Sequence, residues 1–249
     1  MPAPADLLND FSSCDVADAL GRLGHDAPYS GYLPDIVMYS PEYCRGSTKI
    51  VGEAFTVKVF PESKSGQRCA DELLIINGVF PKMVDKSDTT SPKPVQHFVD
   101  AAPSDCIMVI SAPPNVKNAV WGGLMAAGAK TRGVRGVVVD GRVRDLAEQR
   151  EDGFPVFARA PSILGAGAFT RPSLLATPVT IHRGDGHPPL TVRPGDIIVA
   201  DLDGVVCVPV ERVAEVAEEC RKGVETDGRC MEAIRAGAGV QETFKKFRG

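Results

Sequence analysis

The sequence has few aromatic residues and no excess of positive charge. Aromatic residues make up 6% of the 249 residues, with a single Trp, and 28 Lys and Arg residues stand against 32 Asp and Glu residues. The formal net charge at pH 7 is therefore -4. A dedicated nucleic-acid-binding protein normally shows a basic excess or a basic stripe. We therefore expect no nucleic-acid partner.

Long apolar runs are also lacking. No segment approaches the roughly 18 consecutive apolar residues of a membrane-spanning helix. The N-terminal residues, MPAPADLLNDFSS, do not show the order of basic, apolar and small residues that marks a signal peptide. These absences predict a protein without a membrane partner and with a cytoplasmic location.

The seven cysteines form no recognisable metal or disulfide pattern. There is no Cys-x-x-Cys pair and no His at the spacing of a zinc site. An odd set of scattered thiols is typical of structural cysteines in a reducing compartment. A chain of this length buries roughly 70–75% of its unfolded surface, so it needs neither disulfides nor a structural metal to fold. Any bound metal is therefore expected to serve chemistry.

The middle of the chain predicts a βαβ unit. A strand is expected over residues 105–112, a helix over about 118–132, and a second strand over 136–140. Strands connected in this way lie parallel in one sheet. A short charged segment of helical character, 144–152, then leads to a third strand, FPVFAR, at 154–159.

The segments before and after this unit complete a single α/β domain over residues 1–249. We expect an amphipathic helix at 12–24, a loop from Tyr29 to Cys44, a strand at 50–60 and a surface excursion at 61–95. Four short strands follow between Thr177 and Pro209, with Asp203-Gly204 as a hairpin turn. A long C-terminal helix should bury one apolar stripe, made of Val213, Val216, Ala217, Cys220 and Val224.

The segment 121–145 carries the residues most suited to chemistry. Gly122 and Gly123 stand at the start of a predicted helix, where free N–H groups and the helix dipole favour an anion. Arg144 and Asp145 follow the next strand, at the carboxyl edge of the sheet, where open α/β folds bind their ligands. These are the parts of a site for an oxyacid bound to a hard divalent cation.

This segment, GGLMAAGAKTRGVRGVVVDGRVRD, resembles the RraA-like proteins, and FSSCDVADAL, SGYLP, IVGEAFTV and PGDIIVADLDGVVCVP extend the resemblance over about residues 11–235. That family includes class II 4-hydroxy-4-methyl-2-oxoglutarate (HMG/CHA) aldolases, oxaloacetate decarboxylases and a ribonuclease regulator. The sequence is most similar to the fungal branch. The resemblance implies an α/β, RraA-like fold of the β/β/α swivelling-domain type, with mixed sheets and a C-terminal helix.

The resemblance also implies roles for individual residues. Asp145 matches the Asp that binds Mg²⁺ or Mn²⁺, and Arg144 matches the Arg that faces the pyruvyl oxygen and stabilises an enolate. The substrate, a small 2-oxo acid, would have its carboxylate held by backbone N–H groups of one loop. That loop consists of Gly122, Gly123, Leu124 and Met125. The resemblance further implies that this chain assembles as a homotrimer or homohexamer.

One position departs from the aldolase pattern. The bacterial aldolases carry an acidic residue twenty-one positions before the Arg, and this sequence has Gly123 there. A further acidic residue, contributed across a subunit interface by the C-terminal helix, could be Glu225, with Glu218 and Glu219 as alternatives.

The missing carboxylate separates the two reactions of the family. Retro-aldol cleavage needs a base for the C4 hydroxyl proton, whereas decarboxylation of oxaloacetate needs only an electron sink. The sequence therefore predicts a metal-dependent lyase that decarboxylates oxaloacetate, with weaker or no cleavage of HMG. The alternative is a non-catalytic RraA-like regulator that binds another protein.

Overall fold

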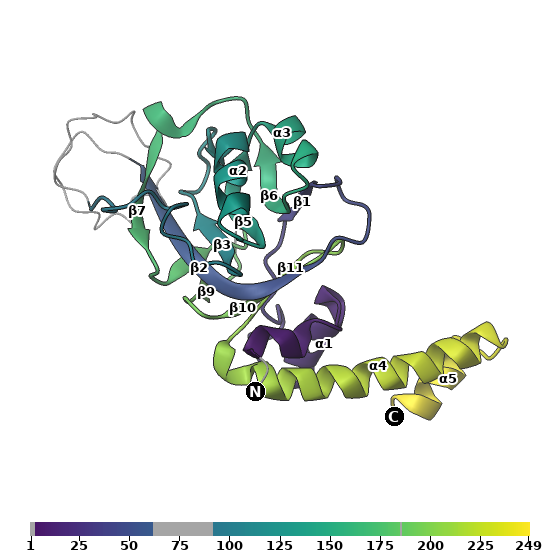
Figure 1. Ribbon diagram of the computed structural model, residues 1–249. Coiled ribbons are helices and arrows are strands. Elements are labelled where there is room, and N and C mark those ends of the chain that lie inside the picture. The colour runs from purple at the N-terminus through teal and green to yellow at the C-terminus, as the bar shows by residue number, and fades with distance from the viewer. Residues whose placement is uncertain (1–2, 62–91, 185) are drawn as a thin grey trace.

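The structure is a computed structural model that describes residues 3–61, 92–184 and 186–249. It shows a curled mixed sheet with helices packed outside it, as the α/β prediction requires (Figure 1). The excursion expected at 61–95 lies for the most part outside the described residues.

One large sheet organises the described chain. Its strands are β1 (Val37–Ser40), β2 (Ile50–Pro61), β3 (Ile107–Ser111), β4 (Ala119–Trp121), β5 (Gly136–Val143), β6 (Val156–Pro161), β7 (Thr170–Leu175), β10 (Ile197–Ala200) and β11 (Val205–Val208). They follow the order β1-β6-β5-β3-β2-β10-β11, with β4 beside β5 and β7 beside β2. A separate antiparallel pair consists of β8 (Val179–Ile181) and β9 (Leu190–Val192).

The predicted βαβ unit is present, with one addition. Strands β3 and β5 are parallel, and the helix between them is α2 (Gly123–Thr131). The residues expected to begin this helix instead form β4, which pairs with the end of β5. Trp121 of β4 is buried and stacks on Phe154, so tertiary packing holds these residues extended. The helix then begins only after the extended Gly122.

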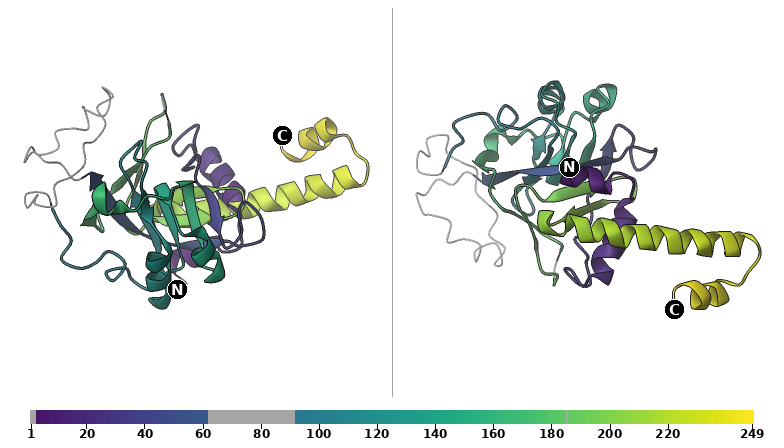
Figure 2. Two further views of the ribbon diagram at one scale, coloured as in Figure 1. Left: turned by 90° about the horizontal axis from the view of Figure 1, so that it is seen from above. Right: turned by 60° about the horizontal axis from the view of Figure 1, so that its bottom comes forward.

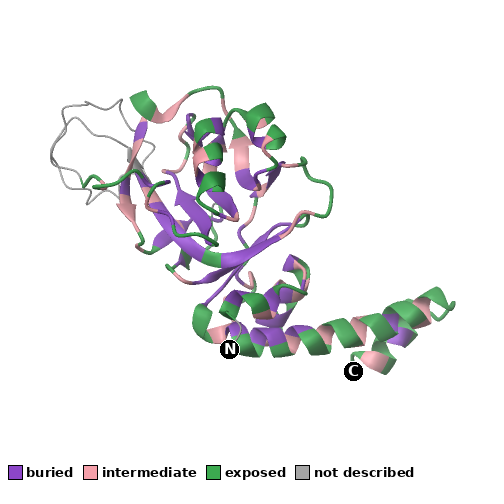
Figure 3. Cartoon of the chain, viewed as in Figure 1, coloured by how far each residue is buried: buried purple, intermediate pink, exposed green. Residues whose placement is uncertain are grey.

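Both faces of the parallel strands are buried, which explains their continuous apolar sequences. Met108 and Ile110 of β3 point to the core beneath α2, whereas Ile107 and Val109 point to the core on the opposite face. Figure 3 shows these strands buried along their length while the outer surfaces of the helices are exposed. The sheet is thus a rigid platform for the loops at its edges.

The helices cover the sheet on two sides. Their bounds are α1 (Ser13–Arg22), α2, α3 (Leu146–Glu151), α4 (Val213–Arg235) and α5 (Val240–Phe247), with short 3₁₀ turns at Pro4–Leu8, Ala166–Ala168 and Val210–Arg212. Helix α1 and the first half of α4 pack on β10 and β11. None of the helices in the described ranges combines the length and the apolar character needed to cross a bilayer.

The C-terminal helix differs from its prediction in one residue. Val213, Val216, Ala217 and Cys220 are buried as expected, but Val224 is 45% exposed. The reason is that α4 projects beyond the body of the molecule, and α5 folds back beside its far end (Figure 2). The apolar stripe therefore continues past the surface against which its first half packs.

Two strands of the structure were not expected from the sequence. Strand β1 lies inside the segment expected to be a loop, and β7 was not predicted. The Asp203-Gly204 turn does join the antiparallel strands β10 and β11, as expected.

The six cysteines in the described ranges form no disulfide with one another. Burial raises the pKa of the Cys106 and Cys220 thiols to about 12, so both remain unreactive at neutral pH.

Candidate functional site

The candidate site lies where β4 and β5 end side by side. Trp121 pairs with Val143 in this parallel ladder, and the Arg144 N–H donates a hydrogen bond to the Trp121 carbonyl at 3.0 Å. The residues that follow each strand are therefore held next to each other. They are Gly122, which precedes α2, and Asp145, which precedes α3.

Asp145 bridges the two strand ends through its side chain. Its backbone is left-handed, with φ of 60°, a conformation that Asp and Asn accept more readily than most residues. The carboxylate oxygen Oδ2 accepts a hydrogen bond from the Gly123 N–H at 3.2 Å. A Cβ on Gly122 would lie 2.7 Å from the same oxygen, so this close approach requires glycine at position 122.

The Arg144 side chain is half-exposed and makes little use of its hydrogen-bond donors. Its side chain is 45% exposed, and its contact with Asp145 is a single Nε–Oδ2 distance of 3.4 Å. A Cβ on Gly165 would lie 3.1 Å from Nη1, which means that the β6–β7 connection passes directly beside the guanidinium. In the described part of the chain, the Nη groups have no carboxylate partner. They can therefore bind an external anion.

The predicted carboxylate-binding loop is only partly open. The Gly123 N–H already faces Asp145, and the Met125 N–H donates to the Gly122 carbonyl at 3.1 Å. Leu124 is 81% exposed, and its N–H has no acceptor within the described ranges. A substrate carboxylate here would thus depend on the Leu124 N–H together with Arg144, rather than on a row of free backbone groups.

Two residues of α3 belong to this region and were missed from the sequence. Gln149 is fully buried, and its Nε2 donates a 2.6 Å hydrogen bond to the Arg144 carbonyl. Its own N–H bonds to the Asp145 carbonyl at 3.2 Å. Gln149 therefore fixes the backbone of both predicted site residues. A Gln between charged residues of a short helix gives no sequence signal for such burial.

The second missed residue is Glu148. Its carboxylate occupies the space beside Gly123, where a Cβ would lie 2.8 Å from the carboxyl carbon of Glu148. Helices α2 and α3 run next to each other, so two positions far apart in sequence meet here (Figure 1). Only a three-dimensional structure could have shown this approach.

The model of the RraA-like family, described as Aldolase/RraA, matches residues 13–207. The chain belongs to this family. A protein from Albidiferax ferrireducens named "Putative 4-hydroxy-4-methyl-2-oxoglutarate aldolase" is 33% identical over 79% of this chain and 94% of its own length. An uncharacterized protein from Pseudomonas syringae pv. tomato has a similar structure, with a TM-score of 0.72, 28% identity and coverage of 96% of both chains.

This RraA-like chain matches only part of the length of other relatives. Protein DlpA of Legionella pneumophila is 26% identical over 247 residues, which are 99% of this chain and 34% of DlpA. The chain matches about 60% of the length of two further curated relatives.

The acidic candidates on the C-terminal helix of this RraA-like chain lie away from Asp145. Helix α4 runs on the far side of the sheet from α3 (Figures 1 and 2). Glu225 is exposed and forms an ion pair with Arg229 one turn later. Glu218 and Glu219 pair with Arg221 and Arg22. A role for Glu225 across a subunit interface stays a prediction.

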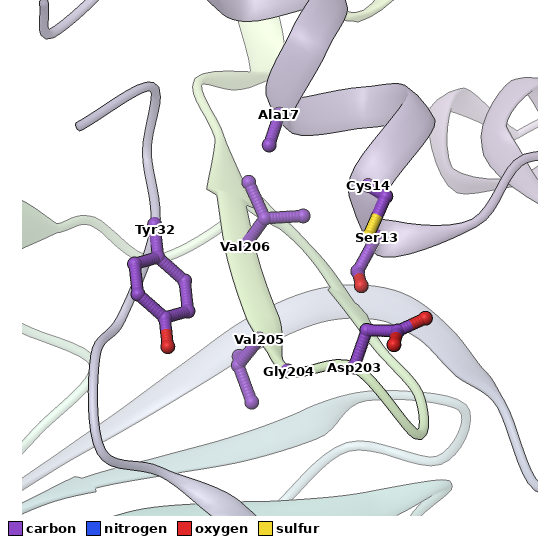
Figure 4. A pocket seen from close by; sticks show the side chains of 8 residues that line it. All are labelled: Ser13, Cys14, Ala17, Tyr32, Asp203, Gly204, Val205 and Val206. Atoms are coloured by element: carbon purple, nitrogen blue, oxygen red, sulfur yellow. The ribbon is translucent and has the colours of Figure 1, made fainter. Parts of the chain in front are cut away.

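Two hollows in the RraA-like fold lie elsewhere. One, of about 80 Å³, is lined by Ser13, Cys14, Ala17, Tyr32 and residues 203–206 (Figure 4). It is smaller than the roughly 300 Å³ of typical ligand pockets. A broader polar hollow of about 380 Å³ extends from Asp10 to Lys49 and Asp203. Neither of these two hollows is lined by Arg144 or Asp145.

Proposed function

We propose that this protein is a divalent-metal-dependent lyase that forms pyruvate, with oxaloacetate as its main substrate. The observation that carries the proposal is the pairing of a half-exposed guanidinium, Arg144, with the carboxylate of Asp145 at the ends of β4 and β5. Membership of the Aldolase/RraA family and the aldolase name of one relative support lyase chemistry.

The residues present fit a hard divalent cation. Asp145 offers a partly exposed carboxylate, and Glu148 places a second carboxylate near the same helix end. The described residues contain no cluster of three or more His, Cys, Asp or Glu side chains that could enclose a metal. Mg²⁺ and Mn²⁺ suit such a sparse set, because Mg²⁺ keeps several water ligands and binds through one or two carboxylates. Asp145 would hold the ion, which would supply Lewis-acid stabilisation of developing negative charge.

The chain's own groups would bind and orient the 2-oxo acid. Arg144 would donate hydrogen bonds to the substrate oxygens, as a planar guanidinium does to carboxylates and oxyanions. The Leu124 N–H would donate to the substrate carboxylate at the start of α2. Gln149 would keep the Arg144 backbone in place through its bond to the carbonyl. These donors are directed to where charge develops in the reaction, which is where they accelerate it most.

Decarboxylation then needs no base. The C3–C4 bond of oxaloacetate breaks, CO₂ leaves, and the bonding electron pair becomes the C2 enolate of pyruvate beside Arg144. A proton from solvent at C3 completes pyruvate. Cleavage of HMG leads to the same enolate but requires, in addition, a group that removes the C4 hydroxyl proton. Gly123 has no side chain that could remove this proton, and we therefore propose oxaloacetate as the preferred substrate.

A second proposal concerns assembly. The part of α4 beyond Cys220, together with α5, projects from the body and exposes apolar residues, namely Val224, Met231, Val240 and Phe244. Exposed apolar surface of this kind marks association sites. We infer that the chain works as a homotrimer or homohexamer, which light scattering after gel filtration would measure.

The test of the function is pyruvate release from oxaloacetate, coupled to lactate dehydrogenase, with Mg²⁺, Mn²⁺ or EDTA. Asp145→Asn keeps the left-handed backbone acceptable and removes the charge, so it should abolish metal-dependent turnover. The protein-free rate with metal must be subtracted, because the free ion also decarboxylates oxaloacetate. Equal rates for the wild type and the variant would refute the role of Asp145. No release by the wild type would favour the regulator that binds another protein.

A further inference from the structure

We propose that Gly165 is a positioning residue for Arg144: its backbone covers one face of the guanidinium and leaves the in-plane hydrogen-bond donors directed to the substrate. The inference rests on the proposed function and adds a residue of the β6–β7 connection to that site. It starts from the space that this glycine leaves. A Cβ on Gly165 would lie 3.1 Å from Nη1, 3.4 Å from Cζ and 3.7 Å from Nη2 of Arg144.

These three distances place the missing side chain over the face of the guanidinium. A Cβ at the edge of the group would be much closer to one nitrogen than to the other two atoms, whereas the three distances are nearly equal. The N–H donors of a guanidinium form a fixed fork in its plane. The contact with Gly165 therefore uses the face of the Arg144 head group and leaves its in-plane donors available to an anion.

The backbone does not require glycine at position 165. Its φ of -78° and ψ of 163° describe an extended conformation that any residue adopts. A Cβ there, however, would approach the Arg144 head group more closely than the roughly 3.5–4.0 Å of a favourable contact. The neighbouring guanidinium therefore explains why this position has no side chain.

A second glycine lines the aliphatic part of the Arg144 side chain. A Cβ on Gly122 would lie 3.3 Å from Cγ and 3.4 Å from Nε of Arg144. The backbone of Gly122 is also extended, with φ of -153° and ψ of -176°. Gly122 precedes α2 and Gly165 follows β6, so two segments far apart in sequence leave room for the same side chain.

The segment that carries Gly165 is fixed to both strands of the site. The Ser162 N–H donates a 2.8 Å hydrogen bond to the carbonyl of Val143, the last residue of β5. The Leu164 carbonyl accepts a 2.8 Å hydrogen bond from the N–H of Ala119, the first residue of β4. Because these bonds hold the segment in place, a side chain at position 165 would displace the guanidinium and not the backbone.

The test replaces Gly165 with residues of increasing size. Gly165→Ala requires the Arg144 head group to move by a few tenths of an ångström, and Gly165→Val requires more. Catalytic groups need to be held within about 0.5 Å of the productive position, and a misplacement of 1 Å can cost about 100-fold in rate. We expect kcat/KM for oxaloacetate to fall by about 3- to 10-fold in Gly165→Ala and by about 30- to 100-fold in Gly165→Val.

A matched control separates this role from a general effect on the loop. Gly167→Ala changes the same segment, but a Cβ there would meet no atom within 4 Å. It should leave the activity unchanged. The melting temperature should not fall in either Ala variant, because both backbones accept Ala and the substitution restricts the unfolded chain. Equal losses of activity in the two Ala variants would overturn the role of Gly165.

A double-mutant cycle tests whether Gly165 acts through Arg144. Lys at position 144 has no counterpart of Nη1, the atom nearest to the added Cβ. In the Arg144→Lys background, Gly165→Ala should therefore lower the remaining activity by less than about twofold. The same loss in both backgrounds would show that Gly165 acts independently of the guanidinium and would overturn the proposal.

Binding of oxalate gives a measurement that does not depend on turnover. Oxalate is a planar dianion that resembles the pyruvate enolate, and calorimetric titration in the presence of Mg²⁺ would measure its Kd. This Kd should rise by about 3- to 10-fold in Gly165→Ala and stay unchanged in Gly167→Ala. Such a rise in a protein that releases no pyruvate would support the role of Gly165 and refute the proposed lyase activity. A wild type that binds no oxalate would overturn the positioning role itself.

Discussion

Two arginine–aspartate pairs of this protein have the same chemistry and opposite surroundings. The Arg183 side chain is fully buried, donates from both Nη atoms to the Asp26 carboxylate, and bonds through Nε to the Tyr32 carbonyl at 3.2 Å. The Arg144 side chain is 45% exposed and has one 3.4 Å contact with its neighbour Asp145. The hydrogen-bond donors of the Arg183 guanidinium are therefore occupied, whereas most of those of Arg144 are available to another group.

This difference teaches how to separate a structural pair from a ligand-binding one. A buried pair is costly to break because the partner left behind is an uncompensated charge. An exposed pair contributes little to stability, and its donors stay accessible to an external ligand. Asp140 follows the first pattern, since its carboxylate is bound by Arg159 and by the His182 N–H although it lies on the same strand as the candidate site. Proximity to the sheet edge is therefore not sufficient.

The largest expected effect comes from breaking the buried pair. Asp26→Asn tolerates the left-handed backbone at this position, where φ is 51°, but leaves Arg183 without its counter-charge. We expect a loss of about 2–3 kcal/mol in the free energy of unfolding, below the range for fully enclosed pairs because Asp26 is partly exposed. Urea denaturation would measure it. The matched variant Asp145→Asn should change stability by less than about 0.5 kcal/mol, and similar losses for both would erase the distinction.

A smaller effect, on activity, should follow from changing the exposed pair. Arg144→Lys keeps the charge but cannot reproduce the planar, two-pronged donor set of the guanidinium. We expect kcat/KM for oxaloacetate to fall by about 10- to 100-fold, with an unchanged melting temperature. Steady-state kinetics with calorimetry on the same sample would check both. Full activity with Lys would show that a point charge suffices and that the orientation of the donors is irrelevant.

The smallest effect is in the pH dependence of stability. Burial raises the pKa of the Asp26 carboxyl, but hydrogen bonds from Arg183 and from the Gly31 N–H outweigh it and lower that pKa below its ordinary value. The resulting stability is complete above the unfolded pKa of about 4 and is lost as the pH falls through the lower folded pKa. Unfolding free energies measured between about pH 5 and pH 2 should therefore drop more steeply for the wild type than for Asp26→Asn. Parallel curves would contradict this assignment.

The sequence predicted the elements whose apolar pattern is strong. The βαβ unit, α1, the β10–β11 hairpin and the first half of α4 follow from periodicity and turn residues. Strand β4 was missed because it is three residues long and is held extended by the packing of Trp121 on Phe154. The exposure of Val224 could not be predicted either, because a helical stripe does not indicate where the surface beneath it ends.

The residues of the candidate site could also be predicted only in part. Arg144 and Asp145 are adjacent in sequence, so their pairing at a strand end could be predicted. Glu148 and Gln149 act through contacts between α2, α3 and the end of β5, which depend on the angle at which the helices pack. Sequence spacing alone does not contain that angle.

The left-handed backbone of Asp145 also bears on how such a protein can change over evolutionary time. After glycine, Asn and Asp adopt this conformation most readily. Their side chains have nearly the same shape and differ by one charge. A lineage that exchanges Asp for Asn at this position would lose the carboxylate but keep its fold, the arrangement of the strand ends at the site and its assembly. Loss of catalysis would leave almost no structural trace, and a former enzyme could persist as a binding protein. One family can therefore contain both kinds of protein without any change in architecture.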